Sequence, residues 1–165
     1  MKKTIVILIA AALSMSAYAQ TQVIRAFSHR GGRMERDENT LIAFQESWEA
    51  GFTGFETDIR MTQDGIPVCI HDQSVDRMTD GEGMVNLLSL EEIESFIIDH
   101  GNGLLTYNEE HIPTLREFLV FCKESSVRPI LDMKVHGKKD IITVCQLVAE
   151  LDLAGQVIFQ DNNSK

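Results

Sequence analysis

Apolar residues recur with two different periods along residues 25–160. Short runs rich in β-branched and aromatic residues alternate with longer stretches in which apolar residues return every three or four positions. The short runs predict strands and the longer stretches predict helices that bury one face. The predicted strands are 25–29, 54–59, 66–71, 128–134 and 156–160; the predicted helices are 39–50, 89–98, 138–151 and one that begins at Thr114. Strands that alternate with helices indicate a parallel sheet, either open or closed into a barrel.

Polar residues mark where three of these helices begin. Asn39 is a predicted N-cap, and Ser89 and Thr114 each open a capping box with a Glu three residues later. The connection between residues 72 and 127 is longer than one crossover requires. Its first part, about 76–105, is therefore a possible small insertion above the sheet.

Residues 1–19 have the pattern of a secretory signal peptide. Lys2 and Lys3 precede an apolar run over residues 4–13, and Ala17 and Ala19 occupy the small-residue positions of a cleavage site. A membrane-spanning helix needs about 20 apolar residues, so the run is too short for a stable membrane anchor. The pattern predicts an exported protein, periplasmic or secreted, with residues 20–165 as the mature chain.

Composition narrows the classes of function. The 165 residues contain 15 Lys and Arg against 25 Asp and Glu, for a net charge of −10 that becomes −12 when the leader is removed. An acidic chain lacks the basic surface that nucleic-acid binding requires, and a phosphate substrate would need a cation or a local basic cluster. The three cysteines, Cys69, Cys122 and Cys145, match no metal motif, and we expect buried free thiols.

The second predicted strand carries two carboxylates. Glu56 and Asp58 are two residues apart, so both side chains point to the same side of the strand. Two carboxylates at close range raise each other's pKa unless a cation lies between them. Oxygen ligands suit Ca²⁺ or Mg²⁺. The alternative is a solvent-exposed pair on an edge strand, and spacing alone does not separate the two interpretations.

Two histidines follow apolar strands. His29 and His71 each end a predicted strand, and function gathers at the carboxyl ends of strands in parallel α/β folds. Beside one cation they could act as general acid and general base. A satisfied structural role is the alternative for each histidine taken alone.

Three further residues are candidates for the same rim. Arg30 could hold a phosphate oxygen, or could form a surface ion pair with Glu35 or Glu38. Asp132 and Lys134 share one face of the fourth strand and could add an oxygen ligand and a cation. Their alternative is an internal salt bridge.

The order of these motifs resembles the glycerophosphodiester phosphodiesterases. The resemblance covers His29 to about Gln160 and is carried by residues 28–32, 38–41, 56–60, 64–65, 68–72, 76–83 and 112–115. It implies a (β/α)₈ TIM barrel, a divalent metal (Ca²⁺ or Mg²⁺) and hydrolysis of a glycerophosphodiester to glycerol 3-phosphate and an alcohol. By position it implies an acid–base pair (His29, His71), metal ligands (Glu56, Asp58, Asp132) and phosphate contacts (Arg30, Lys134).

Two departures from the family pattern keep other functions open. Asp132 stands where the family usually has Glu, and its side chain is one methylene shorter. A TIM barrel takes about 250 residues, whereas the mature chain has 146 and about five predicted strands, so we expect a truncated barrel. The alternatives are an inactive remnant or binding module, and a related phosphodiesterase of the same barrel type that acts on a phosphoinositide or a lysophospholipid.

Overall fold

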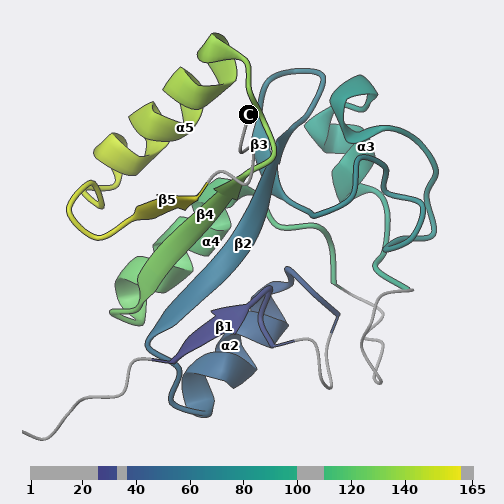
Figure 1. Cartoon of the computed structure of the whole chain (residues 1–165). Helices are drawn as coiled ribbons and strands as arrows, with labels where there is room; N and C mark the ends of the chain where they lie inside the picture. The colour runs from purple at the N-terminus through teal and green to yellow at the C-terminus, as the bar shows by residue number, and fades with distance from the viewer. Residues whose placement is uncertain (1–25, 33–36, 100–109, 161–165) are drawn as a thin grey trace, which may run out of the picture.

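A computed structural model of the chain describes residues 26–32, 37–99 and 110–160 (Figure 1). The predicted signal peptide at 1–19 and part of the predicted insertion at 76–105 lie outside the described residues. No helix in the described ranges is long and apolar enough to span a membrane. The strands are β1 (Phe27–His29), β2 (Gly54–Met61), β3 (Pro67–Cys69), β4 (Arg128–Met133) and β5 (Ile158–Gln160). The helices are α2 (Leu41–Glu49), the 3₁₀ helix η1 (Val85–Leu87), α3 (Leu90–Glu94), α4 (Leu115–Glu124) and α5 (Lys138–Glu150).

The five strands form one sheet, with β2 at its centre. Strands β1, β2, β4 and β5 are parallel and adjacent in that order, whereas β3 pairs antiparallel with the end of β2. The sequence pattern predicts a parallel strand at residues 66–71, and that direction is wrong. The turn at Asp64–Gly65 returns the chain directly alongside β2, and a short connection of this kind can join only antiparallel neighbours.

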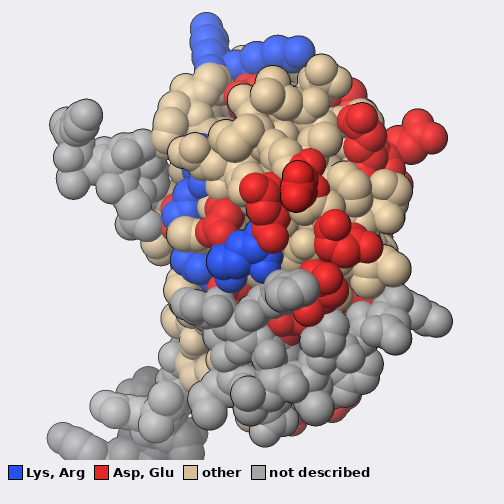
Figure 2. All heavy atoms as spheres, turned by 90° about the vertical axis from the view of Figure 1, so that its right-hand side faces the viewer, with Lys and Arg blue, Asp and Glu red and all other residues tan. Residues whose placement is uncertain are grey.

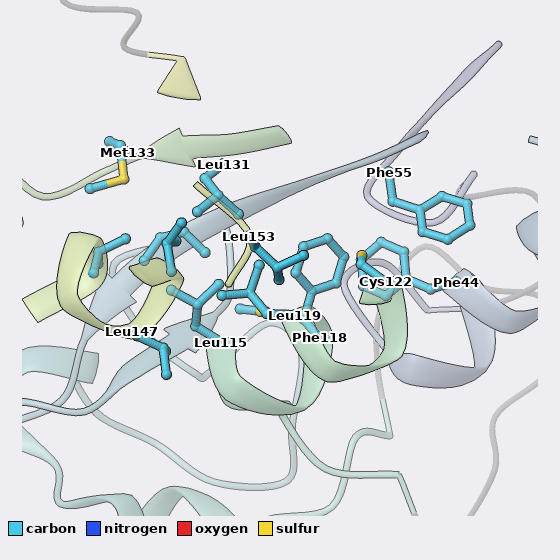
Figure 3. Close-up of a cluster of buried hydrophobic side chains, with 14 of the residues drawn as sticks. Phe44, Phe55, Leu115, Phe118, Leu119, Cys122, Leu131, Met133, Leu147 and Leu153 are labelled. Atoms are coloured by element: carbon cyan, nitrogen blue, oxygen red, sulfur yellow. The ribbon is translucent and has the colours of Figure 1, made fainter. Parts of the chain in front are cut away.

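One face of the sheet is apolar and is covered by helices (Figure 3). Phe55 and Leu131 point from β2 and β4 toward Phe44 of α2 and Phe118 of α4, and Val144 of α5 joins the same cluster of buried residues. Strand side chains alternate between faces. The intervening residues of β2 and β4 therefore point to the opposite face, which is where the predicted site residues lie.

The two predicted capping boxes are present. The side chains of Ser89 and Thr114 each accept a hydrogen bond from the backbone N–H of the Glu three residues later. The carboxylate of that Glu in turn accepts from the backbone N–H of the capping residue. The predicted cap at Asn39 is wrong, because Thr40 caps α2 by accepting from Ala43 N–H at 3.2 Å. Asn39 has a positive φ of 59° and directs its side chain toward β2 instead.

A second cluster of buried apolar residues packs between β3 and the segment that contains α3, which lies to the right of the sheet in Figure 1. It joins β3 and the residue after it to the segment that follows, and its buried members are Val68, Ile70, Val75, Met78, Val85, Ile93, Ile98 and Ile112. This cluster holds the loop after His71 in place against the sheet.

The cysteines are all free thiols. Cys69 and Cys122 are buried as expected, but Cys145 is exposed, which corrects the expectation for that residue. The buried stripe of α5 consists of Val144, Leu147 and Val148. Successive helical residues are rotated by about 100°, so Cys145 lies beside this stripe and faces solvent.

Candidate functional site

The register of the parallel strands assembles the predicted metal ligands. His29 of β1 pairs with Glu56 of β2, and Asp58 of β2 pairs with Asp132 of β4. Glu56, Asp58 and Asp132 offer oxygen atoms that all lie within 4.8 Å of one another. The three residues are only 7%, 0% and 3% exposed on the central strands, so the interpretation as an exposed pair on an edge strand is wrong.

Two basic side chains lie against this carboxylate cluster. Arg30 Nε is 3.0 Å from Asp58 Oδ2, and Lys134 Nζ is 2.7 Å from Asp132 Oδ2 and 3.2 Å from Asp58 Oδ1. The internal salt bridge considered for Asp132 and Lys134 is therefore present, and it includes Asp58. Figure 2 likewise shows a small group of Lys and Arg side chains among Asp and Glu on one face of the molecule. An acidic protein thus provides a local basic group at which a phosphate could be held.

The turn after β1 places Arg30 over the cluster. Arg30 has a positive φ of 55°, an uncommon conformation for a residue with a side chain. Its backbone N–H lies 3.2 Å from Glu56 Oε2 and 3.0 Å from the Glu56 carbonyl oxygen, its two acceptors. The next residue, Gly31, has φ +81°, and a Cβ there would lie 2.5 Å from Ala43 Cβ. The tight packing of this turn on α2 therefore fixes the position of Arg30.

Burial and like charge both perturb the pKa of Glu56, and only the effect of like charge is predicted from the sequence. Burial first, and the neighbouring charge of Asp58 second, raise the pKa of Glu56 to about 7. For Lys134, burial lowers the pKa, but the contacts with Asp132 and Asp58 outweigh it and raise the pKa overall. The cluster therefore favours a bound cation, because a positive charge relieves the repulsion between its carboxylates.

The donor set fits a hard divalent cation. All three candidate ligands are carboxylates, the ligand type that Ca²⁺ and Mg²⁺ prefer. Asp58 Oδ1 is buried and accepts no hydrogen bond of good geometry from the described residues, although Lys134 Nζ is near. A buried carboxylate oxygen in that state is suited to a metal ligand. The shorter side chain of Asp132 is compatible with this arrangement, since its oxygen already lies within the cluster.

Both candidate histidines border the same edge of β2. β4 occupies one edge of β2, while β1 and β3 share the other. His29 Nε2 is 3.6 Å from Glu56 Oε2, with a side chain that is 59% exposed. His71 follows Ile70, whose N–H donates to the Asp58 carbonyl at 3.0 Å. His29 therefore lies beside Glu56, and the main chain that precedes His71 lies beside Asp58, where an antiparallel strand places it.

Several polar residues around the site go beyond the sequence prediction. Asn39 donates to Asp58 Oδ2 at 3.1 Å and accepts from Thr57 at 2.8 Å. The sequence indicates Glu38 only as a surface partner of Arg30, yet Glu38 is 1% exposed and also accepts a hydrogen bond from Arg77. The signal for Asn39 and Glu38 was present, because both belong to the run 38–41 that carries the family resemblance.

Fold and site together define an α/β protein of the TIM-barrel type with a buried oxygen-ligand cluster on its parallel sheet. The sequence profile of the glycerophosphoryl diester phosphodiesterase family matches residues 29–160, and the chain belongs to this family.

Known proteins are similar to this chain over part of their length. Human glycerophosphodiester phosphodiesterase 1 is 41% identical over 117 residues, which are 70% of this chain and 35% of that protein. The crystal structure of a glycerophosphodiester phosphodiesterase from Agrobacterium tumefaciens matches with a TM-score of 0.76 at 25% identity, over 86% of this chain and 59% of that one. A phosphodiesterase from Oleispira antarctica, solved with the product sn-glycerol-3-phosphate, matches with a TM-score of 0.74 at 27% identity, over 86% and 58%. The chain thus spans about a third of the human relative and over half of the two solved chains.

Proposed function

We propose that this protein hydrolyses glycerophosphodiesters to glycerol 3-phosphate and an alcohol, with Ca²⁺ or Mg²⁺ bound by Glu56, Asp58 and Asp132. The observation that carries the proposal is the cluster of these buried carboxylates, whose oxygen atoms lie within 4.8 Å of one another, with both candidate histidines at the same edge of β2. The relative from Oleispira antarctica was solved with sn-glycerol-3-phosphate as product, which supports this product here. Residues 1–19 have a signal-peptide pattern that supports export as part of the same proposal.

Each side chain of the site has a role in this reaction. A bound divalent cation would supply a Lewis acid and a positive charge beside the phosphate. Arg30 and Lys134 would hold phosphate oxygens and stabilise the charge that develops in the transition state. One of His29 and His71 would remove the proton from the attacking hydroxyl, which is water or the glycerol hydroxyl of the substrate. Attack by water gives glycerol 3-phosphate directly, whereas attack by the glycerol hydroxyl gives a cyclic glycerol phosphate that a water molecule must then open to glycerol 3-phosphate. The other would protonate the leaving alcohol.

The test is hydrolysis of glycerophosphocholine by the chain 20–165. We expect release of glycerol 3-phosphate with Ca²⁺ or Mg²⁺, loss of release with chelator, and loss in His71→Ala. His111→Ala is the matched control, because His111 lies outside the site, with its Nε2 3.6 Å from Oε1 of Glu117 in α4. Turnover retained in His71→Ala would remove His71 from the acid–base role.

The second candidate is a binding module or inactive remnant that keeps the carboxylates and histidines of the site. The matched part of this chain covers 59% of the solved Agrobacterium tumefaciens chain. A folded chain that binds Ca²⁺ or Mg²⁺ but releases no glycerol 3-phosphate would support this candidate. Activity on a phosphoinositide or lysophospholipid in place of glycerophosphocholine would instead support a related phosphodiesterase.

A further inference from the structure

A row of alternating charges links His71 to the carboxylate cluster. Asp72 accepts hydrogen bonds from His71 Nδ1 at 2.8 Å and from Arg77 Nε. Arg77 Nη2 donates to Glu38 Oε1 at 2.6 Å, and Arg30 Nη1 donates to the same oxygen at 3.3 Å. Arg30 then reaches Asp58. Every acid in the row lies between basic partners.

The charge state of Asp72 determines which nitrogen of His71 carries the proton. The hydrogen bond from Arg77 is the main reason that the pKa of Asp72 is lowered to about 2. Asp72 is therefore a carboxylate at any pH at which the protein works, and a carboxylate only accepts hydrogen bonds. The contact at 2.8 Å with Asp72 Oδ1 therefore requires a proton on His71 Nδ1. Nε2 of the neutral ring is then the unprotonated nitrogen that can act as a base.

The backbone of His71 is fixed independently of its ring. Arg60 donates from Nε at 2.8 Å and from Nη2 at 2.6 Å to the His71 carbonyl oxygen. These two bonds hold the main chain, and Asp72 holds the ring. A catalytic imidazole requires both restraints, because a small misplacement of a reacting group is costly in rate.

We propose that Asp72 is the positioning residue of His71, which sets its Nδ1–H tautomer, and that Arg77 orients Asp72 for this role. The inference rests on the proposed function, in which His71 exchanges a proton at Nε2. An ordinary surface ion pair between Asp72 and Arg77 would leave the His71 tautomer unchanged when Asp72 loses its charge. The two interpretations therefore differ in an observable that does not depend on turnover.

Asp72→Asn gives opposite predictions for the two interpretations. The charged Arg77 donor is the stronger partner for the amide oxygen, so the amide NH₂ is left facing His71. That group only donates, and His71 Nδ1 must then accept, which moves the proton to Nε2. In the double variant Asp72→Asn with Arg77→Met, the amide oxygen is free to turn toward His71, and the Nδ1–H tautomer returns.

The experiment is ¹⁵N NMR of the histidine rings in the chain 20–165, with His71 assigned among the five histidines by His71→Gln. Asp76→Asn is the matched control: Asp76 lies in the same loop, and its Oδ1 accepts from Gly83 N–H at 2.8 Å, a bond that the Asn oxygen can keep. We expect the Nδ1–H tautomer in the wild type and in the control, the Nε2–H tautomer in Asp72→Asn, and the Nδ1–H tautomer again in the double variant. A fall in kcat of about 10²–10⁴-fold in Asp72→Asn should accompany the change, with KM little altered.

The outcomes separate this proposal from the proposed function. An unchanged tautomer in a folded Asp72→Asn protein, or a wild type with its proton on Nε2, would overturn the positioning role. The expected tautomer series in a protein that hydrolyses no glycerophosphodiester would support the positioning role and contradict the proposed function. If Asp72→Asn does not fold, Arg77→Met alone carries the test: the tautomer should stay Nδ1–H, while two ring orientations should appear in the NMR signals of His71.

Discussion

The affinity of the carboxylate cluster for a divalent cation should rise about tenfold between pH 6 and pH 8, because Glu56 must lose its proton to become a ligand. The pKa of Glu56 is raised to about 7 in the protein without a metal. At pH 6, Glu56 is ionised in about one molecule in eleven, and at pH 8 in about ten in eleven. The ratio of these fractions is the expected ratio of affinities.

The direction of this pH dependence follows from the protonation state of Glu56 that the metal ion and the proton each favour. A cation binds the ionised form of Glu56, whereas a proton stabilises the neutral form, so metal and proton compete. A pKa raised on folding also means that Glu56 stabilises the metal-free protein below its ordinary pKa of 4.5 and loses this contribution as the pH rises through about 7. A bound cation should restore stability in this upper range.

Titration calorimetry of the chain 20–165 with Ca²⁺ or Mg²⁺ measures the effect directly. In two buffers of different ionisation enthalpy, metal binding should release about 0.9 proton at pH 6 and about 0.1 at pH 8. Glu56→Gln should bind more weakly and show no pH dependence. His29→Gln should retain the dependence, which separates Glu56 from its neighbouring histidine. Wild-type affinity that is flat from pH 6 to pH 8, without proton release, would refute the reasoning.

Three further substitutions test the site and the fold. Lys134→Met removes the ammonium from two candidate ligands and should raise cation affinity about tenfold in calorimetry while abolishing hydrolysis; weaker binding would contradict this. In urea unfolding, Glu38→Gln should cost about 3 kcal/mol, because it removes the buried carboxylate that pairs with Arg30 and Arg77, whereas loss of the exposed ion pair between Arg116 and Glu150 should cost much less. Equal costs would show that burial does not decide the difference. Gly31→Ala should destabilise by about 2 kcal/mol more than Gly65→Ala, since both have positive φ but only Gly31 lacks space for a Cβ, and a melting-temperature comparison checks this.

The periodicity of the sequence predicts most of the architecture because it reflects which faces are buried. The capping boxes at Ser89 and Thr114 are local signals, and both are present. The direction of β3 is not encoded by its own apolar residues, which suit either pairing direction; the turn at Asp64–Gly65 decides it. Cys145 was misplaced for a similar reason, since an apolar residue one position beside the buried stripe fits the pattern almost as well.

The candidate metal ligands were accessible to sequence reasoning, but the contact between Glu38 and Arg77 was not. Glu56 and Asp58 share a face through the strand period alone. Glu38 and Arg77 are 39 residues apart and meet through the loop that packs under α3. No periodicity links these two positions, so the ion pair between Glu38 and Arg77 follows only from the tertiary structure.

The strand register that packs the core also fixes the positions of the site residues, because a single register sets both faces of the sheet. Leu131 of β4 lies opposite Thr57 and packs under the helices, while the next residue, Asp132, lies opposite Asp58 on the other face. A slip of β4 by one residue would turn Asp132 toward Phe118 and expose Leu131 to the polar face. That arrangement would bury an unpaired carboxylate among apolar groups and lose the burial of a leucine, both of which are costly. The register that packs Leu131 into the core therefore also holds Asp132 beside Asp58, so core packing by itself aligns the two carboxylates.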